Sequence, residues 1–299
     1  MQQALISGTI TALITPFTGD RAEKIDYDSL EQLIEWQISQ GIDGFVLCGT
    51  TAEVATLGDS ERKELLRRSV EMISGRVPVI IGTGTNCTTE SIRRTREAVE
   101  LGVNQVLAIC PYYNKPSQEG LKRHFLELAE CSTAGVIVYN VPSRVVVDLS
   151  TDTIAELAKH EKIIGIKQAA DKVSALVEIS SLLDDGFALY AGDCPMTYHV
   201  LASGGLGVIS ASSNAIPELM CNIARNYFDG SAVDALDAQI KALPYIKALF
   251  SETNPVPAKE MLRQLGIIKS AAVRLPLVEV SGMLGQEIAR LVGLLKEGV

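Results

Sequence analysis

Short apolar runs alternate with amphipathic stretches along most of the chain. Runs that are apolar throughout are typical of strands buried on both faces in a parallel sheet. They predict strands at residues 9–14, 44–47, 79–81, 105–109, 136–139, 163–167, 188–190 and 207–210. Apolar residues at helical spacing predict helices at residues 28–39, 61–73, 89–101, 118–130, 153–159, 172–183, 196–202 and 217–228. Suitable N-caps stand at four of the predicted helix starts: Asp59, Thr88, Ser117 and Ser150.

Eight strand–helix units in succession predict an α/β fold, a (β/α)8 TIM barrel. The alternative is a doubly wound open sheet, which more often carries a glycine-rich nucleotide-binding turn after its first strand, and this chain has none. After about residue 230 the alternation stops, and helices are predicted at 234–250, 258–265 and 278–295. We therefore expect a catalytic barrel over residues 1–230. We expect a small C-terminal helical extension over 231–299, packed on the barrel or on a neighbouring subunit.

Composition narrows the classes of partner and cofactor. The 299 residues include 36 acidic and 27 basic ones, a formal charge of −9 that argues against nucleic acid or an anionic membrane as a partner. No apolar run is long enough to span a membrane, and residues 1–7 lack the features of a secretory signal, so we expect a cytoplasmic protein. The three histidines and six cysteines are scattered without metal-binding spacing, so we expect neither a metal nor a cofactor.

One of the predicted strands, residues 163–167, ends in a lysine, Lys167. An ammonium group at the end of a buried strand sits among apolar neighbours, which lowers its pKa and makes it a candidate amine nucleophile. In the alternative reading, Lys167 simply reaches solvent at the strand end.

Further polar residues follow the predicted strands, where a barrel places its chemistry. Tyr139 ends the strand next to that of Lys167, so its hydroxyl is a candidate general acid/base beside the amine. Thr50 and Thr51 follow the second strand and could relay protons or hold a carboxylate. Arg144 offers a planar fork for a second carboxylate. Taken singly, each could equally be an ordinary strand-end aromatic, turn or surface residue.

Four motifs resemble those of the dihydrodipicolinate synthase family, within the pyruvate-dependent class I aldolases that include N-acetylneuraminate lyase. They are Gly49-Thr50-Thr51-x-Glu53, Pro111-Tyr112-Tyr113-Asn114-Lys115-Pro116, Tyr139-Asn140-Val141-Pro142-x-Arg144 and Gly165-Ile166-Lys167. The resemblance covers essentially the whole chain. It implies a lyase of the diaminopimelate and lysine pathway in which Lys167 forms a Schiff base with pyruvate. The enamine then adds to L-aspartate 4-semialdehyde, giving 4-hydroxy-tetrahydrodipicolinate.

The resemblance also implies roles for individual residues. Thr50, Tyr113 and Tyr139 match the proton relay, with Tyr113 reaching in from the adjacent subunit of a tight dimer. Thr51 would hold the pyruvate carboxylate and Arg144 that of the semialdehyde. Gly192 and Ile209 match positions that line the pocket near the lysine. Asn86, Glu90 and Tyr112 match residues at which lysine inhibits some family members, and whether it inhibits this protein stays open. Family members are commonly homotetramers, pairs of tight dimers, and need no metal or organic cofactor.

Other functions stay open from the sequence. The nearest competitor is another Schiff-base pyruvate aldolase, such as an N-acetylneuraminate or 2-keto-3-deoxy sugar-acid lyase, against which Arg144 and Thr51 argue. A non-catalytic metabolite-binding barrel and a metal-dependent aldolase are further alternatives.

The chain also departs from the family pattern. Ala52 replaces a usual glycine, and Val145-Val146 replaces a common Thr-Gly pair, so the loop carrying Arg144 is expected to differ in shape.

Overall fold

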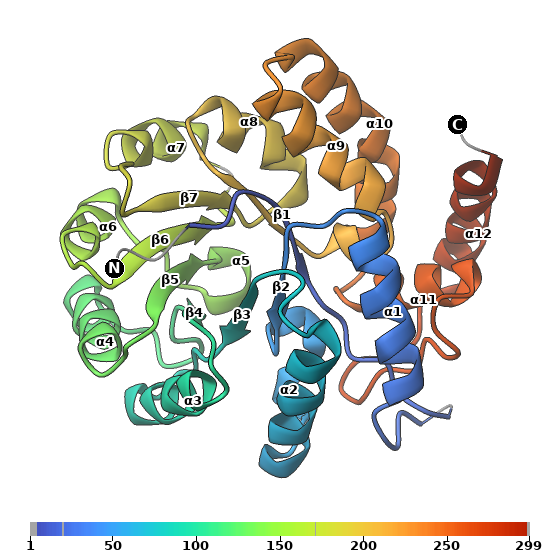
Figure 1. Ribbon diagram of the computed structural model, residues 1–299, viewed down its shortest axis with the longest axis horizontal. Coiled ribbons are helices and arrows are strands. Elements are labelled where there is room, and N and C mark those ends of the chain that lie inside the picture. Colours follow the sequence, from blue (N-terminus) through green and yellow to red (C-terminus); the bar gives the residue numbers. More distant parts are fainter. Residues whose placement is uncertain (1–4, 20, 171, 298–299) are drawn as a thin grey trace. The chain divides into compact units, whose positions relative to one another are not determined.

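The computed structural model describes residues 5–19, 21–170 and 172–297. Within them, eight parallel strands form a closed barrel, in the order in which they occur in the chain (Figure 1). The strands are β1 (Gly8–Ala12), β2 (Gly44–Leu47), β3 (Val79–Gly82), β4 (Gln105–Ile109), β5 (Gly135–Asn140), β6 (Ile163–Gln168), β7 (Ala188–Ala191) and β8 (Gly207–Ser210). The predicted barrel is confirmed, with strand ends shifted by at most two residues.

The helices follow the predicted order. They are α1 (Tyr27–Ser39), α2 (Asp59–Ile73), α3 (Thr88–Glu100), α4 (Gln118–Glu130), α5 (Pro142–Val145), α6 (Thr151–Ala158), α7 (Val173–Ser180), α8 (Thr197–Ala202), α9 (Pro217–Phe228), α10 (Ala232–Phe250), α11 (Val256–Leu265) and α12 (Gly282–Glu297). The N-caps Ser117 and Ser150 are confirmed, because each side chain accepts a backbone N–H bond of its helix. The other two are wrong, since Asp59 and Thr88 are already the first helical residues.

The chain divides into two compact units, which are described separately here. Unit 1 comprises Met1–Ile10, Gly44–Val46 and Pro78–Ser210, and unit 2 comprises Thr11–Asp43, Leu47–Val77 and Ala211–Val299. The proposed division at residue 230 into barrel and extension stays a prediction.

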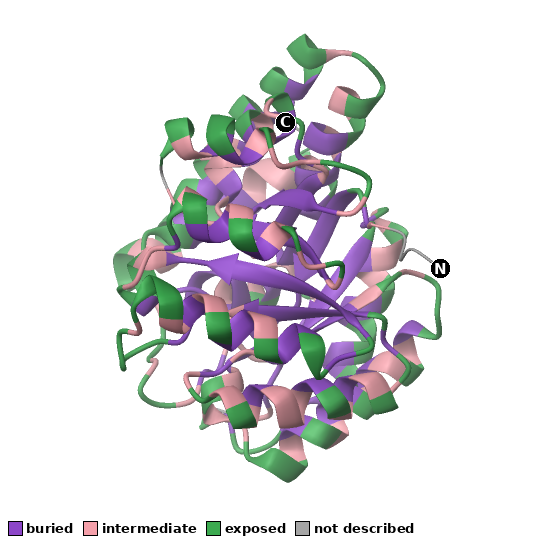
Figure 2. Cartoon of the chain, turned by 90° about the vertical axis from the view of Figure 1, so that its left-hand side faces the viewer, coloured by how far each residue is buried: buried purple, intermediate pink, exposed green. Residues whose placement is uncertain are grey.

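The core of unit 1 is a set of adjacent parallel strands, β4 to β7, whose residues are nearly all buried (Figure 2). In the register of β5 and β6, Tyr139 lies opposite Lys167. Lys167 in turn lies opposite Tyr190 of β7. Gly165 is required by this packing, because a Cβ there would lie 2.6 Å from the carbonyl oxygen of Ala188. The strand that carries the lysine is therefore fixed against both of its neighbours.

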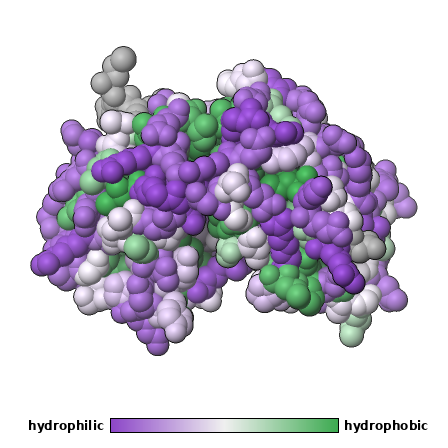
Figure 3. Space-filling view, turned by 90° about the horizontal axis from the view of Figure 1, so that it is seen from below, coloured by the Kyte–Doolittle hydropathy of each residue, from purple (hydrophilic) through white to green (hydrophobic). Residues whose placement is uncertain are grey.

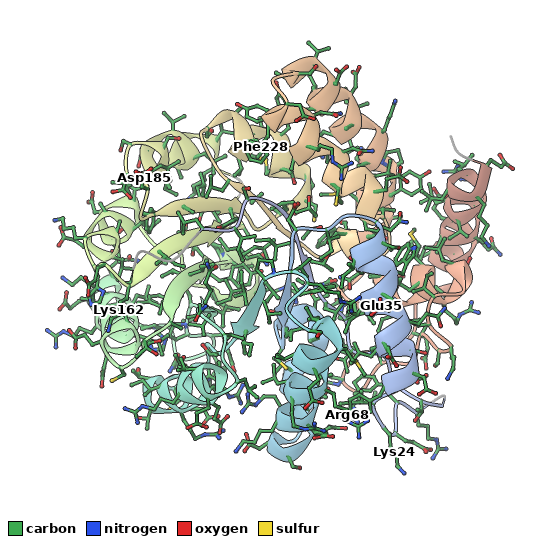
Figure 4. All side chains as sticks on the ribbon, in the orientation of Figure 1. Lys24, Glu35, Arg68, Lys162, Asp185 and Phe228 are labelled. Atoms are coloured by element: carbon green, nitrogen blue, oxygen red, sulfur yellow. The ribbon has the colours of Figure 1, made fainter. Side chains whose placement is uncertain are left out.

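Charged side chains connect α1 and the end of α2 at the surface of unit 2. The guanidinium of Arg68 on α2 stacks over the Tyr27 ring of α1, 4.2 Å from its centroid, and Glu35 of α1 pairs with Arg76, which follows α2. Figure 4 labels Arg68 and Glu35 on these two helices. Such exposed pairs add little stability. On the molecular face in Figure 3, hydrophilic residues prevail and hydrophobic ones gather in a few patches. No helix of the described residues is both long and apolar enough to cross a membrane.

Candidate active site

Lys167 is a buried amine at the carboxyl end of β6. Only 6% of the residue is exposed. Burial disfavours the charged ammonium and lowers the pKa of Lys167 to about 8, with the charge of Arg144 acting in the same direction and Cys194 and Asp193 opposing it. A neutral amine is the nucleophilic form, so this environment suits attack on a carbonyl carbon.

Tyr139 forms one wall around this amine. The Lys167 Nζ atom lies 4.2 Å from the centroid of the Tyr139 ring, on the face of the ring. Burial raises the pKa of Tyr139 to about 12, so its hydroxyl is protonated at neutral pH. The predicted neighbourhood of these two side chains is confirmed, because the Lys167 nitrogen lies over the ring of Tyr139 and the two residues are paired in the register of β5 and β6.

Arg144 lies on the short helix α5, which begins directly after β5 and leaves its side chain exposed. The helix ends at Val146, which has a φ of 69° and is 67% exposed. A β-branched residue is strained in this left-handed region, where glycine is favoured. The sequence had indicated an altered loop here. The structure shows one turn of helix ended by a strained valine.

An amide network ties this loop to the end of β6. The Asn140 side chain donates to Asp148 Oδ1 at 2.8 Å and to Gln168 Oε1 at 3.0 Å, and its own oxygen accepts the Leu149 N–H. Asn140 and Gln168 follow Tyr139 and Lys167 directly. This network was not predicted from the sequence, although both residues stand inside or beside the four motifs.

Gly192 and Ile209 occupy the ends of the next two strands. The Gly192 N–H donates to the Gln168 carbonyl at 2.7 Å, and a Cβ on this glycine would lie 2.7 Å from Ala169 Cβ. Ile209 on β8 is fully buried. The buried thiol of Cys194 lies 3.3 Å from Ser210 Oγ and influences Lys167 electrostatically. This effect on the lysine was not predicted from the sequence, because Cys194 belongs to none of the four motifs.

Thr50 and Thr51 lie in unit 2, in a single turn of 3-10 helix, Thr50–Ala52. Ala52, which stands where the family usually has glycine, does not need a left-handed backbone, because the left-handed residue of this turn is Glu53, with a φ of 55°. Thr51 Oγ1 accepts a hydrogen bond from Asn254 Nδ2 at 2.9 Å, a contact the sequence did not predict.

Glu53 fixes the end of this threonine turn. Its carboxylate lies 2.6 Å from Lys259 Nζ, and its second oxygen accepts the Arg274 N–H at 3.0 Å. Both side chains of the Glu53–Lys259 pair are buried. Lys259 also donates to the Ala272 carbonyl at 2.7 Å. Burial lowers the pKa of Lys259 to about 8, against the pull of the Glu53 carboxylate. Residues from the C-terminal part of the chain thus hold the turn in place.

The remaining predicted residues belong to the segment after β4 and to the start of α3. Tyr113 is 88% exposed, with a φ of 74°, and Tyr112 is also exposed. The backbone oxygen of Asn86 accepts a bond from Asn114. Glu90 is paired with Arg93 and Arg94, whose hydrogen bonds lower its pKa to about 2. In the part of the chain that the structure describes, no group of three histidine, cysteine, aspartate or glutamate side chains converges to hold a metal ion.

Comparison with known proteins connects this arrangement to one family. The model of the dihydrodipicolinate synthetase family matches residues 5–294. A 4-hydroxy-tetrahydrodipicolinate synthase from Sorangium cellulosum is 42% identical over 290 residues, covering 97% of this chain and 96% of that protein. The crystal structure of dihydrodipicolinate synthase from Thermotoga maritima has a TM-score of 0.93 and 36% identity, covering 98% and 99% of the two chains. A structure described as the first monomeric dihydrodipicolinate synthase variant matches with the same score and identity, covering 98% and 97%.

Proposed function

The chain belongs to the dihydrodipicolinate synthetase family, and from this premise we propose that Lys167 is the amine on which its reaction proceeds. The activity is that of a lyase of lysine biosynthesis. It condenses pyruvate with L-aspartate 4-semialdehyde to 4-hydroxy-tetrahydrodipicolinate. The observation that carries the proposal is the buried Lys167 amine, with its lowered pKa, against the face of Tyr139.

In the first step the neutral amine of Lys167 attacks the keto carbon of pyruvate. A C–N bond forms, the carbonyl π bond opens, and the Tyr139 hydroxyl gives its proton to the oxygen. That oxygen leaves as water with this proton and one from the amine, and a protonated imine remains. The proposed relay of Thr50 and Tyr113 returns a proton to Tyr139.

The imine then draws electrons from the methyl group of the bound pyruvate. The proposed relay takes up a methyl proton, which leaves the enamine. The enamine carbon then attacks the aldehyde carbon of the second substrate, and the relay gives that proton to the aldehyde oxygen, which becomes the hydroxyl of the product. The amino group of that substrate attacks the imine carbon, which closes the ring and releases Lys167. Thr51 holds the pyruvate carboxylate and Arg144 the carboxylate of the semialdehyde. Gly192 and Ile209 line the same pocket.

Borohydride trapping with pyruvate tests the nucleophile. Reduction of the imine leaves a stable adduct that mass spectrometry and peptide mapping assign to one lysine. Lys259 is the matched internal control, because it is also a buried lysine whose pKa is lowered to about 8. We expect the adduct on Lys167 and its absence in Lys167→Ala. An adduct on another lysine, or none in a folded protein that still binds pyruvate, would refute the assignment.

Arg144 decides between this reaction and that of a sugar-acid aldolase. Its loss leaves the carboxylate of the semialdehyde without its partner, so we expect kcat/KM for that substrate to fall about 100-fold in Arg144→Ala. Trapping of pyruvate on Lys167 should persist in this variant. Normal turnover of the semialdehyde by Arg144→Ala would show that another group binds the carboxylate.

Tyr113 and the surface of α7 support an assembly of subunits, and we propose the homotetramer of paired tight dimers. Tyr113 is too exposed on its own chain to serve a buried site, and Val173 and Val177 present apolar side chains one turn apart on α7. Light scattering measures the mass. Co-refolding Tyr113→Phe with Lys167→Ala subunits should restore about a quarter of wild-type activity if the tyrosine acts across a dimer. No restoration in mixed dimers would refute that role.

Two further predictions concern regulation and location. Asn86, Glu90 and Tyr112 are proposed as contacts for lysine, although Arg93 and Arg94 already neutralise Glu90. The test measures the reaction rate at increasing lysine concentrations, in the wild-type protein and in Glu90→Gln. A wild-type rate that does not change with lysine would refute the proposed site. We also propose a cytoplasmic location, which cell fractionation tests.

A further inference from the structure

Asn254 joins the C-terminal part of the chain to the threonine turn. It lies between α10 and α11 and is 7% exposed, and Thr51 is 5% exposed. Its Nδ2 atom donates to Thr51 Oγ1 at 2.9 Å. Both partners belong to unit 2. This hydrogen bond is therefore buried. It is made to the Thr51 hydroxyl, which in the proposed function holds the pyruvate carboxylate.

The direction of this hydrogen bond decides what the hydroxyl can do. An amide nitrogen can only donate, whereas a threonine hydroxyl has one proton to give and two lone pairs to accept with. Because Asn254 occupies a lone pair of Thr51, the hydroxyl proton points away from Asn254. We propose that Asn254 is a positioning residue that aims the Thr51 O–H at the pyruvate carboxylate. This inference rests on the proposed function.

The backbone of the turn is held by a separate set of contacts. Glu53, two residues after Thr51, pairs with Lys259 at 2.6 Å and accepts the Arg274 N–H at 3.0 Å. The carbonyl of Ala52 accepts the Thr15 hydroxyl at 2.8 Å. Loss of the Asn254 amide is therefore expected to reorient one hydroxyl while the turn stays in place.

A purely structural role for Asn254 predicts a different outcome. Were the amide there only to satisfy buried polar groups, its replacement would lower stability and reduce activity irrespective of Thr51. A residue that acts through Thr51 has no further effect once the Thr51 hydroxyl is gone. A double-mutant cycle of the two positions separates these roles.

The experiment compares Asn254→Asp, Asn254→Ala, Thr51→Val and the double variant Asn254→Ala/Thr51→Val. The aspartate is nearly isosteric, but it accepts the Thr51 proton and repels a carboxylate. We therefore expect Asn254→Asp to raise KM for pyruvate about 10- to 100-fold, with a smaller change in kcat. Asn254→Ala should raise KM for pyruvate less than Asn254→Asp does. The double variant should have the same KM for pyruvate as Thr51→Val alone.

The matched control is Asn226→Ala, because the Asn226 amide also donates within unit 2, to the Asp234 carbonyl at 3.2 Å. It should leave KM for pyruvate unchanged. Thermal melts show which variants are folded, and Asn254→Asp carries the test if Asn254→Ala does not fold.

The outcomes separate this inference from the proposed function. A raised KM with a non-additive double variant supports it. Unchanged KM, or additive effects, in enzyme whose Lys167 still gives the borohydride adduct would overturn the role of Asn254 and leave the proposed function standing. Absence of the adduct in the wild-type protein would overturn both.

Discussion

The rate of imine formation should depend on pH in a way set by the burial of Lys167. Its pKa is lowered to about 8, whereas an ordinary lysine titrates near 10.5. At pH 7 about a tenth of such an amine is neutral, against about 0.03% for an ordinary lysine, so burial supplies about 300 times more nucleophile. The logarithm of the rate should rise with unit slope below pH 8 and level off above it.

Quenched-flow borohydride trapping with pyruvate alone, from pH 6 to pH 10, isolates this step from the second substrate. Two variants move the midpoint in opposite directions. Arg144→Met removes a positive charge that lowers the pKa of Lys167 and should shift the midpoint upward. Asp193→Asn removes a negative charge that raises this pKa and should shift it downward. A rate that still rises steeply at pH 10, or that does not depend on pH, would refute the reasoning.

Two stability predictions concern unit 2 and the arginine loop. Lys259→Met leaves the buried Glu53 carboxylate without its cation and should cost about 3–5 kcal/mol in urea unfolding, whereas Lys259→Met/Glu53→Gln should cost less than the single change. An equal or greater loss in the double variant would contradict the coupling. Val146→Gly relieves a strained, exposed residue and should stabilise the protein by about 1 kcal/mol, which calorimetry would record as a melting point about 2–4 °C higher. A lower melting point would mean that the valine is not strained.

The barrel was predictable from sequence because each buried strand is an uninterrupted apolar run. β2, β4 and β8 begin and end at the predicted residues. Helix α5 and the turn at Thr50–Ala52 were not predicted, because a single helical turn is too short to show a period of 3.6 residues. Helices α2 and α3 were predicted to begin at residues 61 and 89, two residues and one residue too late, because Asp59 and Thr88 were predicted as N-caps and both residue types also occur in the first turn.

The candidate site was predictable where its parts are close in sequence or in strand register. Tyr139 and Lys167 follow from neighbouring strands of the same barrel. The Asn254–Thr51 and Lys259–Glu53 contacts join residues 203 and 206 positions apart, outside any local pattern. A buried lysine in an amphipathic helix looks like any other helix cation until the fold places a carboxylate beside it.

The contacts made by Asn254, Lys259 and Arg274 limit which segments can be exchanged between related barrels in a chimera. All three belong to the last seventy residues of the chain. Each of them contacts Thr51 or Glu53, in the short turn that follows β2. In a chimera that joins residues 1–230 to the C-terminal segment of a relative, the turn would keep its conformation only if the new segment supplied the same three contacts. We therefore expect an exchange of segments between relatives to be tolerated at other junctions sooner than at one that separates this C-terminal segment from its turn.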